Sequence, residues 1–415
     1  MKRKSSSPIS LINDLILEIL SRLPSKSVAR FHCVSKLWDS MLGSPYFKEL
    51  FLTRSSANQR LLFAVHERGV WSFFSSADAE FSSSTTLVAD AEFYVKFSPK
   101  ELKIYNLLYS GDIRKISCGY ASGLLYMYGD RYEARPLICN PITGRYAILP
   151  DRYTFRRAYS FFGFDPIDKQ HKALSMAYPF GPGHHKVLTF GDGDIRWRKV
   201  KNSVRHDINS DGVCINGVLY YLGDSKSCTN DDHVITSDYV IVCFNLRSEK
   251  FTFINVEFVC TQLINYKGKL AIIFWEGDDY YTYDDTMPIH ELHLWVVEDL
   301  EKKKWSKYTY TLSADKFFCH RVSVVGATAS GEILFSMCEY TPKEPFYVFY
   351  FNPERNTLQS VEIQCFGEGF KECCRVLTFL NHVEDLDAND LKLLKSVHPP
   401  LEPPEYMGPS DSESD

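Results

Sequence analysis

Residues 11–52 read LINDLILEILSRLPSKSVARFHCVSKLWDSMLGSPYFKELFL, and this stretch decides how the chain is divided. Apolar side chains recur in it every three or four residues, which is the spacing of one face of an α-helix. The recurring apolar positions are Leu15, Ile16, Ile19, Leu20, Leu23, Val28, Phe31, Val34, Leu37 and Trp38. Three short helices are too few to bury so many apolar side chains among themselves. The pattern therefore predicts either a surface that docks on another protein or a helical subdomain packed on the rest of the chain.

Three helices are expected here, because residues that end or begin helices mark the breaks. Pro24 should end the first helix, since the residue before a proline is driven out of the α conformation. Ser25 then offers an N-cap for the second helix. Gly43 should end the second helix, and Ser44-Pro45 should open the third.

The same stretch resembles an F-box. The run RFHCVSKLWDSML followed by SPYFKELFLTRSS is similar to plant F-box proteins that carry an F-box-associated region, and the resemblance covers residues 9–54. In that family the F-box docks on the Skp-type linker protein of a cullin ubiquitin ligase, so the resemblance implies this partner. The positions that match the family's docking residues are Leu11, Leu15, Ile19, Leu20, Leu23, Pro24, Val28, Cys33, Val34 and Trp38. Ile12 stands where the family usually has proline, and it keeps the apolar contact without the fixed turn.

Two roles are open for each of these positions. Ile19, Leu20 and Trp38 are expected to be the interface anchors, because large apolar and aromatic side chains dominate interface energetics. Leu15 and Val28 could instead hold the helices together.

Beyond residue 60 the chain changes to short apolar, aromatic-rich runs separated by turn residues, which is typical of β-strands. Five segments share the template of an apolar strand, a polar turn and a strand with an aromatic residue. They are ICNPITGRYAILP (138–150), VLTFGDGDIRWRKV (187–200), VIVCFNLRSEKFTFI (240–254), ELHLWVVEDLEKKKWSKY (291–308) and FYVFYFNPERNTLQSVEI (346–363). A second element precedes each one, namely YASGLLYMYG (120–129), FGFDPIDKQHKALSM (162–176), CINGVLYYLG (214–223), NYKGKLAIIFW (265–275) and TASGEILFSM (328–337).

Together the two elements give four strands in a period of about 50 residues, the size of a β-propeller blade. LLFAVHERGVWSFFSS (61–76) looks like one more hairpin, from a first or closing blade, and it resembles the plant F-box-associated repeats, as does NPITGRYAILP. We therefore predict a small all-α F-box of three helices followed by a large all-β domain over 61–387, most simply a six-bladed β-propeller. Seven blades or a β-sandwich remain alternatives at this point. Residues 1–8 and the Pro-rich, acidic residues 396–415 should be disordered.

Composition excludes several functional classes. The net charge is -5 with both signs interspersed, so no nucleic-acid surface is indicated. No apolar run reaches 18 residues, and the basic start MKRK lacks an apolar signal region, so a cytoplasmic or nuclear protein away from membranes is expected. The 12 cysteines contain no C-x-x-C pair, which argues against zinc and, in a reducing compartment, against disulfides.

The chain carries no recognisable catalytic fingerprint, and no cofactor is expected. The residues His184, His185, Asp192 and Asp194 could bind a divalent metal, but adjacent histidines on a hairpin rarely converge, so no metal site is predicted.

Two loops are candidates for recognising a protein target. EGDDYYTYDD (276–285) is acidic and carries Tyr280, Tyr281 and Tyr283, which would suit a basic segment. DRYTFRRAYSFF (151–162) carries Arg152, Arg156 and Arg157, which could bind an acidic or phosphorylated segment. Each stretch could equally be a plain surface loop.

These features predict a non-catalytic substrate-recognition adaptor of a Skp–cullin–F-box ubiquitin ligase, with residues 53–60 joining its two parts in a fairly fixed geometry. Two alternatives stay open: a propeller that binds or converts a small molecule in its channel, or an F-box protein that acts outside a ligase.

Overall fold

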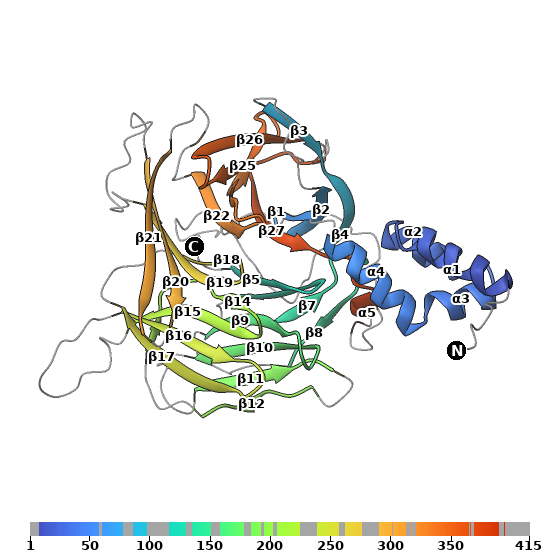
Figure 1. Ribbon diagram of the computed structural model, residues 1–415, viewed down its shortest axis with the longest axis horizontal. Helices are drawn as coiled ribbons and strands as arrows, with labels where there is room; N and C mark the ends of the chain where they lie inside the picture. Colours follow the sequence, from blue (N-terminus) through green and yellow to red (C-terminus); the bar gives the residue numbers. More distant parts are fainter. Residues whose placement is uncertain are drawn as a thin grey trace, which may run out of the picture.

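The computed structural model shows a helical module at the N-terminus and a ring of β-sheets (Figure 1). It describes residues 8–57, 60–77, 86–97, 116–129, 135–150, 158–177, 184–191, 195–201, 206–224, 239–256, 262–275, 290–300, 302–312, 317, 321–364, 366, 369–389 and 394. No helix within these ranges has the length and apolar character needed to cross a membrane.

The helical module, residues 8–57, contains four helices where three were predicted. They are α1 (Pro8–Leu20), α2 (Ser25–Phe31), α3 (Lys36–Leu42) and α4 (Pro45–Ala57). The extra break lies inside the second apolar stripe, where the Ser35 hydroxyl accepts a hydrogen bond from the backbone N–H of Trp38 and caps α3.

The starts and ends of the first two helices also differ from the prediction. α1 ends at Leu20, before Pro24, because Arg22 N–H donates to the Ile19 carbonyl at 3.1 Å and Leu23 N–H to the Leu20 carbonyl at 3.1 Å. These bonds close a tight turn. Ser25 is the first helical residue of α2 rather than its cap, and Pro24 takes the cap position.

The strands form six sheets, here called blades 1 to 6, and this confirms the six-bladed propeller. Blade 1 contains β27 (Cys374–His382), β1 (Arg60–Glu67), β2 (Val70–Ala77) and β4 (Glu92–Phe97), with β24 (Glu339–Tyr340) at the edge beside β27. Blade 2 contains β5 (Ile116–Ala121), β6 (Leu124–Gly129), β7 (Leu137–Cys139) and β8 (Tyr146–Ile148). Blade 3 contains β9 (Ala158–Asp165), β10 (Gln170–Ala177), β11 (His185–Thr189) and β12 (Arg198–Lys199).

The other three blades are also antiparallel, except that β3 pairs in parallel with β26 at the edge of blade 6. Blade 4 contains β13 (Asp207–Ile208), β14 (Val213–Ile215), β15 (Val218–Asp224), β16 (Tyr239–Asn245) and β17 (Lys250–Val256). Blade 5 contains β18 (Gln262–Tyr266), β19 (Lys269–Trp275), β20 (His290–Asp299) and β21 (Lys304–Leu312). Blade 6 contains β22 (Val322–Ala327), β23 (Ile333–Met337), β25 (Phe346–Asn352), β26 (Thr357–Gln364) and β3 (Thr86–Asp90).

The predicted hairpins account for the short connections within the blades. The turns at Ser122-Gly123, Asn216-Gly217 and Lys267-Gly268 have positive φ at both residues, as two-residue hairpin turns of type I′ require. Each predicted pair of elements supplies the first and second, and then the third and fourth, strands of one blade. The β-sandwich and the seven-bladed ring are therefore wrong.

Six apolar clusters fill the spaces between neighbouring blades, one cluster for each pair. The cluster between blades 1 and 2, for example, joins Trp71 and Phe73 to Leu125 and Met127, all fully buried. Because both faces of every sheet are covered, the ring is held together by blade-to-blade packing.

The ring is closed by both ends of the propeller sequence. The C-terminal strand β27 pairs with β1 and so completes blade 1. The N-terminal strand β3 crosses to blade 6 and pairs in parallel with β26. The first and last blades are thus interlocked in two directions.

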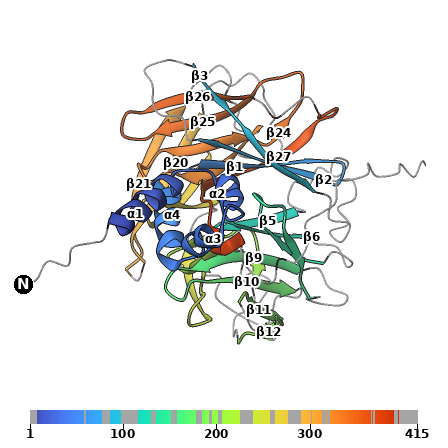
Figure 2. The ribbon, with the colours of Figure 1, turned by 90° about the vertical axis from the view of Figure 1, so that its right-hand side faces the viewer.

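The helical module lies against the outside of the ring, beside blades 1 and 2 (Figures 1 and 2). α4 continues to Ala57, and β1 begins at Arg60, so only residues 58 and 59 separate the helix from the first strand. The short helix α5 (Leu386–Asn389), which follows β27, packs beside α4.

Candidate functional site

Exposed apolar side chains are concentrated on the helical module. Among the described residues, nine large apolar side chains are exposed, and five of them belong to this module. These five are Leu15 (59% exposed), Ile19 (63%), Val34 (60%), Leu37 (59%) and Tyr46 (63%). Such a concentration is typical of surfaces that take part in protein–protein interaction.

The apolar residues of α1 divide between two faces of the helix. Leu17 and Leu20 point into the module's core with Val28, Phe47 and Phe51. Leu15 and Ile19 are four residues apart and therefore share a second, exposed face. Leu11 precedes Leu15 by four residues in the sequence, and its side chain lies outside the described residues.

The α2–α3 region supplies the rest of the exposed apolar surface. Val34 and Leu37 are exposed on either side of the Ser35 cap. Trp38 is half-buried, with its ring 5.3 Å from that of Phe31, so one part of the indole still reaches solvent.

Apart from Leu11, whose side chain is outside the described residues, the predicted docking residues differ in their exposure to solvent. Leu15, Ile19, Pro24, Cys33 and Val34 are exposed, and Leu23 and Trp38 are half-buried. Leu20 and Val28 are buried in the core of the module, with Leu20 only 4% exposed. The exposed Leu37 and Tyr46 were not among the predicted residues, although Leu37 belongs to the helical stripe read from the sequence.

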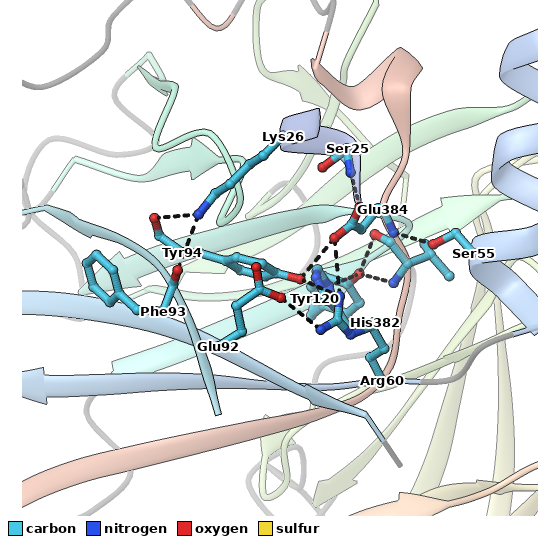
Figure 3. Close-up of polar contacts among 11 residues, drawn as sticks. Ser25, Lys26, Ser55, Arg60, Glu92, Phe93, Tyr94, Tyr120, His382 and Glu384 are labelled. Atoms are coloured by element: carbon cyan, nitrogen blue, oxygen red, sulfur yellow. Dashed lines mark hydrogen bonds and ion pairs between the residues drawn. The ribbon is translucent and has the colours of Figure 1, made fainter. Parts of the chain in front are cut away.

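A buried carboxylate joins the helical module to the ring (Figure 3). The Glu384 side chain accepts hydrogen bonds from Ser25 N–H in α2 at 2.6 Å and from the Tyr94 hydroxyl in β4 at 3.1 Å. Its charged partner is the Arg60 guanidinium in β1, at 3.4 Å. The Glu384 backbone N–H donates to the Ser55 hydroxyl in α4 at 2.6 Å. One residue thus contacts two helices and two strands.

The Tyr120 hydroxyl, close to Glu384, holds the end of β27 in place through a second set of polar contacts (Figure 3). The Tyr120 hydroxyl accepts from Val383 N–H at 3.1 Å and from Gly123 N–H at 3.2 Å, and it lies 2.9 Å from His382 Nδ1. Because both backbone N–H groups donate to the phenol oxygen, the phenol proton is free to point at His382 Nδ1. Burial and the nearby Arg60 charge lower the pKa of His382 to about 3, so this imidazole is neutral at physiological pH.

The predicted target-binding residues Arg152, Arg156, Arg157, Tyr280, Tyr281 and Tyr283 lie outside the described residues, as do Asp192 and Asp194. Within the described residues no group of three or more His, Cys, Asp or Glu side chains could hold a metal ion.

Family comparisons match both parts of the chain. The F-box domain profile matches residues 9–50, and the profile described as F-box associated beta propeller domain matches residues 60–383. F-box protein At2g15640 of Arabidopsis thaliana is 62% identical over 98% of this chain and 100% of its own length. Putative F-box protein At2g16220 of the same plant is 66% identical over 98% of this chain and 97% of its own length.

Among solved structures, a periplasmic gluconolactonase of Pseudomonas aeruginosa aligns with 73% of this chain and 81% of its own, at 9% identity and a TM-score of 0.35. That likeness is too low to support a statement about function. The two family matches and the Arabidopsis relatives are sufficient: this chain belongs to the F-box proteins that carry an F-box associated β-propeller domain.

Proposed function

We propose that this chain is the substrate-recognition adaptor of a Skp–cullin–F-box ubiquitin ligase. Its helical module would dock on the Skp-type linker protein, and its propeller would bind the protein that is ubiquitinated. The observation that carries this proposal is the exposed apolar surface of the F-box, to which Leu15, Ile19, Val34, Leu37 and Tyr46 contribute. Binding of a protein partner would remove these apolar side chains from water.

Burial of these exposed apolar side chains would supply binding free energy. Burying one large aliphatic side chain contributes about 1.5–3 kcal/mol. Association itself costs several kcal/mol, so a few such side chains are needed before binding becomes tight. The half-buried Trp38 adds an aromatic group of the kind that dominates interface energetics.

The propeller offers one face for a target. In blades 2 to 6 the first strand leads to a short turn on one side of the ring, and the second-to-third connection leaves from the opposite side. The strand ends that flank 151–157 and 276–289 both belong to this opposite side. We therefore retain Arg152, Arg156, Arg157, Tyr280, Tyr281 and Tyr283 as candidate target contacts.

No residue of this chain needs to react in this role. The adaptor raises the local concentration of target lysines beside the charged conjugating enzyme, and proximity supplies the rate enhancement. The chain then needs only two binding surfaces and a stable distance between them.

Assembly with purified ligase components tests the proposal. We expect the full chain to co-elute with the linker protein and cullin in size-exclusion chromatography. Ile19→Asp should abolish co-elution because it places a charge in the apolar interface, and Ile19 is too exposed to be needed for folding. Leu20 is unsuitable for this test, because a charge in the core would unfold the module.

Ile167→Asp is the matched control, since Ile167 is equally exposed but lies in the β9–β10 turn of the propeller. This variant should co-elute like the wild type. Failure of the folded wild type to bind the linker would overturn the proposal. Binding to the linker without recruitment of cullin would instead place the protein outside a ligase.

A further inference from the structure

Several contacts that join the two domains involve residues outside both family matches, which cover residues 9–50 and 60–383. Ser55 and Glu384 fall outside these ranges, yet they are hydrogen-bonded to each other across the domain boundary. The same short segment carries Leu386, which is buried in the apolar core of the F-box, and Ala388, which is buried against blades 2 and 3. Residues 383–388 therefore contact both the F-box and the propeller.

Glu384 is the most enclosed of these contacts. Its side chain is 7% exposed and is shared by the Ser25 amide, the Tyr94 hydroxyl and the Arg60 guanidinium (Figure 3). A carboxylate held by three donors from three elements fixes their relative positions, because each bond is directional.

The remaining polar contacts at the boundary are weaker. Lys48 pairs with Asp387 at 2.9 Å, but Asp387 is 71% exposed, so solvent screens this pair. Lys26 donates to the carbonyls of Phe93 and Tyr94, both at 3.2 Å. These contacts contribute to the association of the two domains but do not fix their relative orientation.

The position of Glu384 also links the boundary to ring closure. Glu384 follows β27, the strand that closes blade 1, after the single residue Val383. Val383 N–H and Gly123 N–H both donate to the Tyr120 hydroxyl, which ties this step to the β5–β6 turn. The contacts between Glu384 and the F-box can therefore form completely only after β27 has paired with β1 and closed the ring.

We propose that residues 383–388 are a brace that fixes the orientation of the F-box relative to the propeller, with Glu384 as its positioning residue. The biological role of the brace depends on the proposed adaptor function. In that function, a fixed orientation of the F-box would hold the bound target at a constant distance from the conjugating enzyme. The brace itself is a property of the free chain and is tested without any partner.

Hydrogen–deuterium exchange of the full-length chain is the first test. Glu384→Gln places an amide NH₂ among groups that are all donors, and Glu384→Ala removes the acceptor altogether. In both variants we expect amide exchange in residues 21–31 and 45–57 to speed up by about tenfold or more, while the propeller strands keep wild-type rates. Glu354→Ala is the matched control, because Glu354 makes only an exposed surface pair with Lys267.

Ser25→Pro removes one donor and leaves the carboxylate in place. Proline suits the first position of a helix, and Pro24 already has ψ 147°, which a following proline requires. This variant should show the same local increase in exchange with α2 still formed. Ser25→Pro therefore distinguishes a loss of the contact between the F-box and the propeller from a loss of folding.

Small-angle X-ray scattering and linker binding complete the test. The Glu384 variants should show a larger maximum dimension than the wild type and an unchanged affinity for the linker protein. Wild-type exchange rates and scattering in Glu384→Ala would overturn the brace. If the wild type fails to bind the linker while the exchange difference persists, the adaptor function fails and the brace stands.

Discussion

Ile19 and Leu20 are neighbours in the sequence and have opposite environments in the structure. Leu20 packs in the F-box core, whereas Ile19 is exposed beside Leu15. A helix turns by about 100° per residue, so two adjacent apolar residues at the border of a wide stripe point in clearly different directions. The sequence pattern identified the stripe, but it could not divide the stripe into a core half and an outer half, because that division depends on where α4 packs.

Glycine at position 119 is required by the close approach of two blades. A Cβ built on Gly119 in β5 would lie 2.6 Å from the Cβ of Phe162 in β9, and neither atom can rotate away. We expect Gly119→Ala to lower the free energy of unfolding by about 1–3 kcal/mol, as overpacking in a core does.

Chemical denaturation measures this change, with Gly191→Ala as the control, since no heavy atom lies within 4 Å of a Cβ at Gly191. The control should stay within about 0.5 kcal/mol of the wild type. Equal stability of the two variants would contradict the close packing of β5 on β9.

At the scale of elements, the short hairpins were predictable and the blade-to-blade contacts were not. Segments such as CINGVLYYLG and VIVCFNLRSEKFTFI carry their own turn residues next to their strands, so the sequence specifies the hairpin locally. The break between α2 and α3 was missed because Ser35 lies within an otherwise regular apolar spacing. The available signal was Ser35 itself, because serine is a preferred N-cap residue.

A partly buried ion pair connects blades 3 and 4. The Lys172 ammonium lies 2.9 Å from Glu249 and 2.6 Å from the carbonyl of Leu246, and its side chain is 8% exposed. Arg198 also pairs with Glu249, at 2.7 Å. Glu249→Ala leaves the Lys172 charge with only a carbonyl partner, so we expect a loss of about 2–3 kcal/mol in unfolding free energy.

The control for this pair is again Glu354→Ala, whose exposed partner Lys267 is screened by water, and the expected cost there is below about 1 kcal/mol. A Glu249→Ala variant as stable as this control would mean that the blade 3–4 contact depends on apolar packing alone.

For the whole molecule, ring closure was beyond the reach of the sequence. β27 pairs with β1, and β3 pairs with β26, although each pair joins opposite ends of the propeller sequence. Nothing local to either strand records its distant partner, and a parallel pairing leaves no hairpin signal. The period of the repeats and the available length favoured six blades, but they left seven blades or a β-sandwich open.

Buried histidines should make the whole fold less stable in mild acid. Burial lowers the pKa of His66 and of His171 to about 4, and that of His382 to about 3. In the unfolded chain these groups titrate near pH 6.5, so between that pH and about 4 the unfolded state binds more protons than the native state. Their contribution to stability is therefore complete above pH 6.5 and is lost as the pH falls.

Each of these histidines is expected to lower the free energy of unfolding by about 2 kcal/mol at pH 5 relative to pH 7.5. Thermal unfolding from pH 7.5 to 5 should show a steady fall in Tm, and His171→Gln should flatten part of the slope. A Tm that is constant over this range would show that these imidazoles are not buried as neutral groups.

The measurement that tests the central claim most directly is a calorimetric titration of the full-length chain with the purified Skp-type linker protein. The account predicts saturable one-to-one binding by the wild type and by Ile167→Asp, and a loss of at least about tenfold in affinity for Ile19→Asp. No binding by the folded wild type, or equal binding by all three proteins, would contradict the claim that the exposed apolar face of the F-box is the docking surface.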